Sequence, residues 1–181
     1  MKKNVKTIAY SGVFTALITA ATLISIPIPA TQGYINAGEI LIFTSCFFFN
    51  PIISLIICGL GPALADLILG YAYYAPFTFA IKAVEGLVVS IFLRYTLYKV
   101  FKKQNVSPLS DKVLLDAKAI FLLIAAYSIG TLIMTGGYFL VNCLLYEVPV
   151  AVAELPFDLL QGLLGLVASL SLDYVLAKVK L

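Results

Sequence analysis

Charged side chains inside apolar segments are the residues of this sequence that could do chemistry. Glu39 lies in YINAGEILIF, at the start of an apolar stretch that continues to Phe49, and it has no basic neighbour in the sequence. Lys82 and Glu85 are three residues apart in another apolar segment, so on a helix they share a face and can pair. A charge near the centre of a bilayer costs at least ~2.5–3.5 kcal/mol, so such residues normally face a cavity or another charge. We expect these groups to bind a ligand, and for Lys82 and Glu85 a purely structural ion pair is the alternative.

A second polar set follows a single stripe near the end of the chain. Glu154, Asp158 and Gln161 are spaced at i, i+4 and i+7, which places all three on one face of a helix. Gly162 and Gly165 continue near that stripe and would let a neighbouring helix or a ligand approach closely. The spacing therefore predicts a polar helix face that points to a binding site.

The residues that common catalytic sites require are missing. The chain has no histidine, which excludes an HExxH zinc site and a Ser-His-Asp triad. It also has no Walker A sequence and no GxSxG turn. The three cysteines lie in apolar runs without CxxC spacing, as expected of small buried side chains. We predict a binding protein that is not an enzyme, needs no cofactor or metal, and depends on a partner for any energy-driven step.

The composition requires a membrane. Of the 181 residues, 62% are hydrophobic and 12% are charged, whereas soluble domains are nearer half apolar and a quarter charged. A spanning helix needs about 20 mostly apolar residues. We predict a single all-α membrane domain over residues 1–181 with six transmembrane helices. Their approximate ranges are 7–28, 38–50, 52–71, 76–99, 118–146 and 153–177.

The distribution of lysine and arginine predicts the orientation. Basic residues precede the first helix, flank the connection between the fourth and fifth helices, and end the chain, whereas the three opposite loops contain none. By the positive-inside rule, both termini are then cytoplasmic in the cell membrane. The segment KVFKKQNVSPLSDK is the one polar linker; it could bind a partner or anionic lipid, or be a solvated loop that enforces the topology. A formal charge of +3 gives no indication of nucleic-acid binding.

This topology places the unexplained polar residues of several helices in the outer half of the bilayer. We expect them to converge on one pocket that is open to the outside, together with aromatic rings suited to a flat ligand. The predicted substrate-binding residues are Tyr34, Asn36, Glu39, Asp66, Tyr74, Lys82, Glu85, Tyr138, Asn142, Glu154, Asp158 and Gln161. Further aromatic residues at this level are Tyr71, Tyr73, Phe77 and Phe157, while Asp173 is expected near the cytoplasmic end and solvated.

The first helix carries a candidate partner surface. Gly12, Ala16 and Ala20 recur every four residues, a spacing that lets another helix approach closely in lipid. Such stripes also occur between helices of a single bundle, so the pattern alone fits both docking of a partner subunit and packing within this chain.

Several of these segments together resemble the substrate-binding S components of energy-coupling factor (ECF) vitamin transporters. The resemblance spans essentially the whole chain. Its most specific parts are YINAGEILIF followed by Asn-Pro, the block GLGPALADLILGYAYYAPFTFAIKAVEGLV at residues 59–88, and the stripe at Ala16 and Ala20. The long block is similar to the branch that contains riboflavin-type and hydroxymethylpyrimidine-type S components.

The resemblance implies a division of labour. It implies that this chain captures a small vitamin at its outer face, that a membrane scaffold (T) subunit docks on the small residues of the first helix, and that two cytosolic ATPases drive the cycle. It also implies that the S component topples in the membrane, and that the loop near IPIPATQGYIN is a lid over the site.

The pocket charges narrow the choice of vitamin. Five acids against one lysine would repel an anionic ligand such as pantothenate or biotin. A carboxylate can accept paired hydrogen bonds from an amino group and an adjacent ring N–H, so hydroxymethylpyrimidine, a thiamine precursor, fits best and a pyridoxine-like ring second. Riboflavin remains an alternative ligand, and a stand-alone secondary transporter, a channel or an intramembrane enzyme remain alternative functions.

Overall fold

Helices make up most of the described part of the protein. The computed structural model describes residues 2–28, 31, 33–101 and 116–179. The described elements, in chain order, are α1 (Lys2–Leu23), β1 (Ser25–Pro27), β2 (Tyr34–Asn36), α2 (Gly38–Phe48), α3 (Pro51–Leu69), α4 (Ala75–Phe101), α6 (Ala117–Leu145) and α7 (Val148–Val179). Five of the six described helices are long and apolar enough to cross a membrane. The expected all-α membrane architecture is therefore confirmed.

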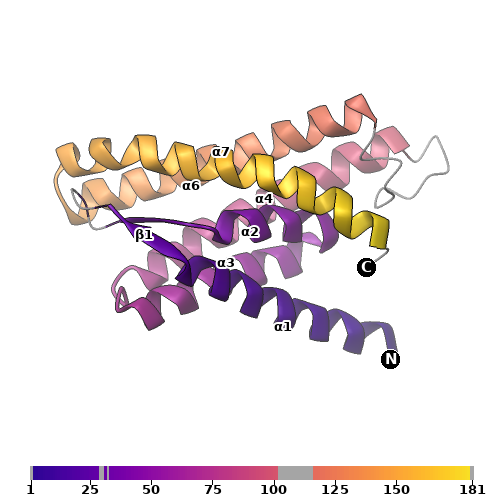
Figure 1. Cartoon of the computed structure of the whole chain (residues 1–181), viewed down its shortest axis with the longest axis horizontal. Coiled ribbons are helices and arrows are strands. Elements are labelled where there is room, and N and C mark those ends of the chain that lie inside the picture. The colour runs from indigo at the N-terminus through magenta and orange to yellow at the C-terminus, as the bar shows by residue number, and fades with distance from the viewer. Residues whose placement is uncertain (1, 29–30, 32, 102–115, 180–181) are drawn as a thin grey trace.

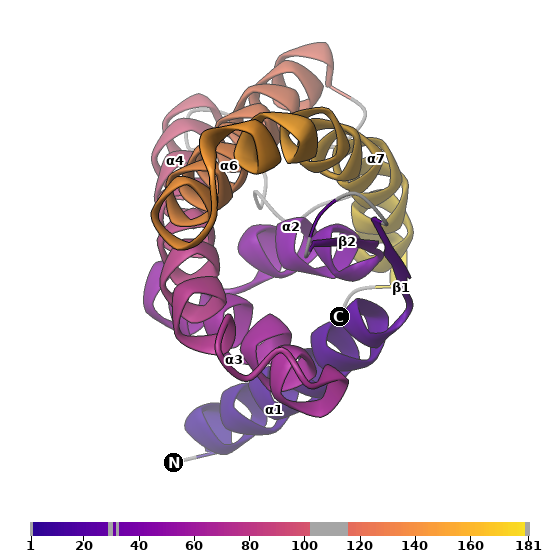
Figure 2. The ribbon, with the colours of Figure 1, turned by 90° about the vertical axis from the view of Figure 1, so that its left-hand side faces the viewer.

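The sixth described helix, α2, lies in the centre of the bundle. Figure 2 shows α1, α3, α4, α6 and α7 arranged around it. Most of its 11 residues are buried, including Glu39, Phe43 and Cys46. At 1.5 Å per residue, a helix of this length covers about 16 Å, roughly half of the hydrocarbon layer. The six expected helices are all present, but α2 is a buried core helix and is too short to cross the membrane by itself.

The first helix is shorter than the sequence predicts. It ends at Leu23 instead of near residue 28, and a two-stranded antiparallel hairpin follows, in which Ser25 faces Asn36 and Pro27 faces Tyr34. Prolines at positions 27 and 29 explain the difference. Proline lacks the N–H that a helix requires and pushes the preceding residue toward extended backbone.

The start of α3 is the tight turn that Asn50-Pro51 predicts. The Asn50 side chain accepts a hydrogen bond of 3.0 Å from the Ile53 amide, and Pro51 occupies the first turn, where its missing N–H costs nothing. The helix ends at Gly70, whose φ of +90° is a left-handed conformation that glycine adopts without strain. These two signals fix both ends of α3 and set where its Asp66 lies.

The last helix is longer than predicted. Its predicted range starts near residue 153, but α7 begins at Val148 and contains Pro149 and Pro156. Pro149 falls in the first turn, where the amide needs no partner, and Pro156 lies further inside the helix. This extension brings Glu154 into regular helix beside Asp158.

The two ends of the bundle differ in content. In Figure 1, α1 begins and α7 ends at the right-hand end, whereas the hairpin and the α3–α4 and α6–α7 turns lie at the left-hand end. We name the left-hand end the hairpin end. Both helix termini thus lie on one side of the bundle, as the predicted topology requires, while their cytoplasmic location stays a prediction. The central part of the predicted polar linker, with Lys102, Lys103 and Lys112, falls outside the described residues.

Candidate binding pocket

A pocket of about 50 Å³ lies at the hairpin end of the bundle, enough for about three or four water molecules. Its wall combines the hairpin, the turn before α4, and parts of every helix, so it is built from segments far apart in the sequence. The lining residues are Thr22, Gly33, Tyr34, Asn36, Ile42, Pro62, Asp66, Tyr71, Tyr74, Thr78, Lys82, Tyr138, Asn142, Glu154, Asp158 and Gln161.

Ten of the twelve predicted substrate-binding residues lie in this wall. Glu39 and Glu85 do not; both are buried behind it. The ten are Tyr34, Asn36, Asp66, Tyr74, Lys82, Tyr138, Asn142, Glu154, Asp158 and Gln161. The expected convergence of polar side chains from separate helices is therefore present in the structure, while their contact with a substrate stays a prediction.

Some lining residues were missed by the sequence analysis. Thr22, Thr78 and Gly33 are small, and threonine and glycine are common in membrane helices and loops, so nothing in their types marks them. Ile42 and Pro62 contribute apolar wall, which sequence alone cannot distinguish from ordinary core. Tyr71 was expected only as a nearby aromatic residue. Spacing relative to Glu39 and Asp66 would have found Ile42 and Pro62, since each is three or four positions away on the same helix face.

The hairpin covers one side of the pocket by hydrogen bonding to two helices. The Tyr34 hydroxyl donates to Asp66 of α3. The Asn36 amide donates to the Gln161 side-chain oxygen of α7 at 2.8 Å, and the Thr31 hydroxyl donates to Glu154 at 3.3 Å. Burial, and then the neighbouring Asp66 carboxylate, raise the pKa of Tyr34 well above its ordinary value, so this phenol remains a donor at neutral pH.

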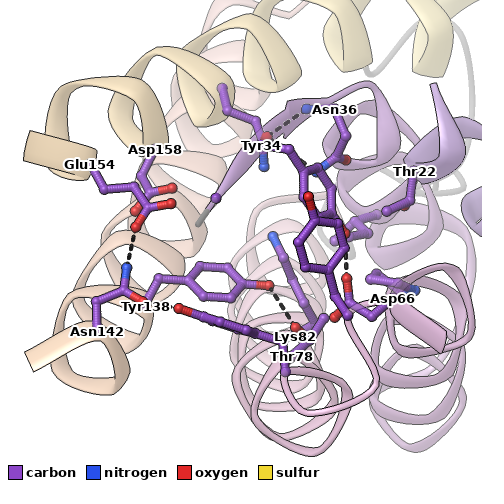
Figure 3. A pocket seen from close by; sticks show the side chains of 16 residues that line it. Thr22, Tyr34, Asn36, Asp66, Thr78, Lys82, Tyr138, Asn142, Glu154 and Asp158 are labelled. Atoms are coloured by element: carbon purple, nitrogen blue, oxygen red, sulfur yellow. Dashed lines mark hydrogen bonds between the residues drawn. The ribbon is translucent and has the colours of Figure 1, made fainter. Parts of the chain in front are cut away.

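The opposite side of the pocket is a chain of hydrogen bonds between α6, α7 and the turn before α4. The Asn142 side-chain amide donates to Glu154, and the Tyr74 hydroxyl donates to Asn142. Burial raises the pKa of Tyr74 above its ordinary value, so it too stays protonated at neutral pH. In Figure 3, Asn142, Glu154 and Asp158 face Tyr34 and Asp66 across the pocket.

Two carboxylate oxygens in the pocket wall are left without a hydrogen-bond partner in the described structure. They are Oδ2 of Asp66, which is 2% exposed, and Oδ2 of Asp158 on the other side. Lys82 reaches the same space from α4, with its ammonium 5.9 Å from the centre of the Tyr138 ring. Buried acceptors normally have partners. The pocket therefore offers two unused acceptors and one cationic donor to an incoming molecule.

Glu39 has a basic partner that the sequence did not reveal. Lys82 of α4 forms an ion pair with Glu39 of α2, and it lies 3.0 Å from Glu85 one turn along its own helix. All three side chains are almost completely buried. The prediction that Glu39 meets a ligand directly at the pocket mouth is not supported by its position, because packing of α2 in the centre turns this carboxylate toward α4.

The expectation that Asp173 is solvated was wrong. Its side chain is fully buried and accepts a hydrogen bond of 2.5 Å from Tyr127, which itself stacks on Phe43 of α2 with ring centres 4.8 Å apart. The prediction failed because the face of α7 that carries Asp173 turns toward α6 and the central helix. Asp173 thus joins α6 to α7 in the half of the bundle away from the pocket.

The aromatic residues divide into two groups. Tyr34, Tyr71, Tyr74 and Tyr138 line the pocket, and the rings of Tyr34 and Tyr71 lie 5.4 Å apart. The side chains expected at the same level that do not line it are Tyr73, Phe77 and Phe157. The pocket is therefore walled by tyrosines, which present a flat face and a hydroxyl.

The fold and this pocket define a helical membrane protein that encloses a small polar site at one end. A model of the family described as "ECF-type riboflavin transporter, S component" matches residues 2–178, and the chain belongs to this family. It is thus a transport subunit, not an enzyme, and a multi-pass protein of the cell membrane that serves uptake of a vitamin or vitamin precursor. The resemblance drawn from the sequence is confirmed.

Two relatives align with nearly the whole chain. One is 34% identical over 163 residues, covering 90% of this chain and 95% of the relative, and is named "Uncharacterized protein in gap 3'region" in Pyrococcus woesei. The other is the thiamine precursor transporter HmpT of Lactococcus lactis subsp. cremoris (strain MG1363). It is 29% identical over 179 residues, covering 98% of this chain and 86% of the relative.

Proposed function

We propose that this chain is the substrate-binding subunit for hydroxymethylpyrimidine, a thiamine precursor, in an ATP-driven ECF importer. The observation that carries the proposal is the pair of unpartnered carboxylate oxygens of Asp66 and Asp158 on opposite sides of a tyrosine-walled pocket. The similarity to a thiamine precursor transporter supports the same class of ligand.

An aminopyrimidine complements the groups that the pocket leaves unused. Its exocyclic amino group and its hydroxymethyl group are donors that suit the free oxygens of Asp66 and Asp158. Its ring nitrogens are acceptors that suit the ammonium of Lys82, which lines the pocket. Its flat ring suits the tyrosine walls. A pyridoxine-like ring lacks an amino group on the ring beside a ring nitrogen and is the second choice.

The pocket dimensions and charge argue against other vitamins. A space of about 50 Å³ must widen for any of these rings, and it must widen most for the three-ring system of riboflavin. Anionic ligands would meet Asp66, Glu154 and Asp158 in the wall with Lys82 as the one opposing charge there. Riboflavin stays the second candidate because the matching family carries that name.

The surface of α1 supports assembly with a membrane scaffold subunit. Gly12, Ala16 and Ala20 are all exposed on one face of the helix, and a Cβ added at Gly12 would meet nothing within 4 Å. The opposite face of α1 packs on α3, where a Cβ at Gly61 would lie 2.8 Å from the Cβ of Ile18. The small-residue stripe is thus left uncovered by the bundle itself. We propose that the scaffold docks there and that two cytosolic ATPases supply the energy.

Titration of the purified protein in lipid nanodiscs tests the ligand. We expect hydroxymethylpyrimidine to bind and to displace any ligand that binds more weakly. Riboflavin and pantothenate should not bind at the same concentration. Tight riboflavin binding without hydroxymethylpyrimidine binding would move the assignment to the second candidate.

Reconstitution tests the coupling. In liposomes that contain this chain alone, we expect little concentrative uptake of labelled hydroxymethylpyrimidine, with uptake appearing when scaffold and ATPase subunits and ATP are added. Concentrative uptake by the chain alone would instead show a secondary transporter.

A further inference from the structure

The ionised forms of Lys82, Glu39 and Glu85 leave one negative charge buried in the bundle. Lys82 pairs with Glu39 and lies 3.0 Å from Glu85, and the three residues are 2%, 1% and 0% exposed. Two carboxylates and one ammonium sum to −1. Removing a charge from water inside a protein costs several kcal/mol unless it is balanced, and within a bilayer no bulk water is near to reduce that cost.

The surroundings of this cluster supply no further cation. The titratable or polar groups that face Lys82 or the two glutamates from the packed elements are Tyr34 of β2, Cys46 of α2, Asp66 of α3, Tyr138 of α6, and Asp158 and Gln161 of α7. Ionisation of either aspartate would add negative charge. Lys82 is the one basic residue among the described residues at the hairpin end. The balance must therefore come from within the cluster.

The hydrogen bonding of the two glutamates is also incomplete if both are ionised. Oε1 of Glu39 and Oε1 of Glu85 are buried and lack a donor in the described structure, and Oε2 of Glu85 has the Lys82 ammonium at 3.0 Å. The two carboxyl groups nevertheless lie close together, because both contact the Lys82 ammonium, Glu85 at 3.0 Å. Two carboxylates this close repel, whereas a carboxylic acid donates a strong hydrogen bond to a carboxylate.

We propose that Glu39 and Glu85 share one proton, so that the cluster is a neutral proton-binding site behind the pocket. The proton turns one carboxyl into a donor toward the other, satisfies the orphaned acceptors, and leaves a single carboxylate to balance Lys82. The ammonium is then held between α2 and α4 with its remaining N–H toward the pocket. This inference goes beyond the proposed function, because it holds whichever ligand the pocket takes.

Infrared spectroscopy of the ligand-free protein in lipid nanodiscs at pH 7 tests the proposal. A protonated carboxyl group absorbs in a C=O band that is separate from the carboxylate bands, and labelling glutamate with ¹³C at its side-chain carboxyl shifts only the glutamate part of it. We expect E85Q to lose the band intensity of one carboxylic acid. E39Q should lose the same amount, because the remaining Glu85 then pairs with Lys82 as a carboxylate. The matched control E147Q, at an exposed position in the α6–α7 turn, should leave the band as in wild type.

Replacement of Lys82 should change the intensity of the carboxylic-acid band in the opposite direction. Without the ammonium, both carboxyl groups should hold a proton, so K82M should gain the intensity of one carboxylic acid. Unchanged intensity in both E39Q and E85Q would overturn the proposal, because neither glutamate then holds a proton in wild type. If K82M fails to fold, the two glutamine variants decide the question alone. Ligand-free samples keep this result independent of the titration that tests the substrate.

Discussion

At the scale of single residues, the pocket is defined by acceptors that have no partner inside the protein. Asp66 and Asp158 each keep a free oxygen in a wall where Asn142 and Gln161 are already engaged in hydrogen bonds. A ligand that donates to these oxygens replaces the hydrogen bonds to water that the oxygens lose when they are buried. Discrimination against ligands without donors follows, since a buried acceptor left unpaired costs about 1–3 kcal/mol.

Asp158→Ala should weaken binding of hydroxymethylpyrimidine by about 1–3 kcal/mol, because the variant removes one of the two acceptors. Glu39→Ala should weaken binding by a similar amount for a different reason, since it removes the contact that ties the Lys82 ammonium to α2 and leaves Glu85, on the same helix as Lys82, as its partner. Calorimetric titration measures both. Glu147→Ala, at an exposed position, serves as the control. Unchanged affinity in both Asp158→Ala and Glu39→Ala would remove the carboxylates from ligand recognition.

Tyr34 predicts how stability depends on alkaline pH. Its pKa is raised in the folded state, so above pH about 10 the unfolded chain has lost a proton that the folded chain still holds. The free energy of unfolding should therefore fall as pH rises beyond about 10. Tyr34→Phe should show a shallower fall between pH about 9 and about 11 in thermal unfolding. Tyr73→Phe, with an exposed ring at the same end of the bundle, is the matched control, and an equal slope in both variants would contradict the burial of the Tyr34 phenol.

Residue types predicted most of the pocket wall, because charged and amide side chains in apolar segments are costly and have few uses. They could not predict how the charges pair. Glu39 and Lys82 are 43 positions apart, and only the packing of α2 against α4 brings them together. The same limit made Asp173 look solvated, since its depth near a helix end says nothing about which face it occupies.

At the scale of elements, the position of the central helix α2 determines where the charged groups behind the pocket lie. It is buried on most of its surface and carries Glu39 at its first turn, so any shift of α2 moves the partner of Lys82. Asn36 fixes the start of this helix, because its side-chain oxygen accepts a hydrogen bond of 2.8 Å from the Gly38 amide. The hairpin and the start of α2 are therefore joined to each other, and Asn36 also joins them to Gln161 of α7.

Gly165→Ala tests this coupling. A Cβ at Gly165 of α7 would lie 2.7 Å from the Cβ and Cγ of Glu39 and 3.3 Å from its backbone carbonyl carbon, so α2 or α7 must shift. We expect a loss of about 1–3 kcal/mol in stability and weaker ligand binding. Gly136→Ala, on α6 with nothing within 4 Å of the new Cβ, should unfold at the wild-type temperature or slightly above. Thermal unfolding in nanodiscs measures both, and equal effects of the two variants would contradict the close contact.

Element boundaries were predictable where the local chemistry is unambiguous. Asn50-Pro51 marked the start of α3, and the structure places it there. The hairpin was missed because three-residue strands with two prolines nearby have no periodic pattern. The extended start of α7 was missed because proline signals a break and only the context shows that it sits in a first turn.

At the scale of the whole molecule, the pocket and the small-residue stripe are separate features. The pocket lies at the hairpin end, whereas Gly12, Ala16 and Ala20 follow the exposed face of α1. This separation allows a partner to bind the side of the bundle without blocking the ligand site. It fits a subunit that captures its substrate and depends on other subunits for the transport step.

Ala16→Leu should separate these two activities. The larger side chain fills an exposed position on α1, so the isolated chain should bind hydroxymethylpyrimidine as wild type does, while uptake by the reconstituted complex should fall at least tenfold, corresponding to about 1.4 kcal/mol of lost docking energy. Val84→Leu, exposed on α4, is the control for a bulkier lipid-facing residue. Normal uptake by Ala16→Leu would place the scaffold contact elsewhere.

The identity of the small molecule retained by the protein tests the central claim most directly. The chain would be expressed in cells supplied with both hydroxymethylpyrimidine and riboflavin, purified in lipid nanodiscs, and its bound small molecules identified by mass spectrometry beside an Asp158→Ala sample. Our account predicts an aminopyrimidine in near-equal molar amount with the wild-type protein and little in the variant. Retention of riboflavin, or equal retention of the aminopyrimidine by both proteins, would contradict it.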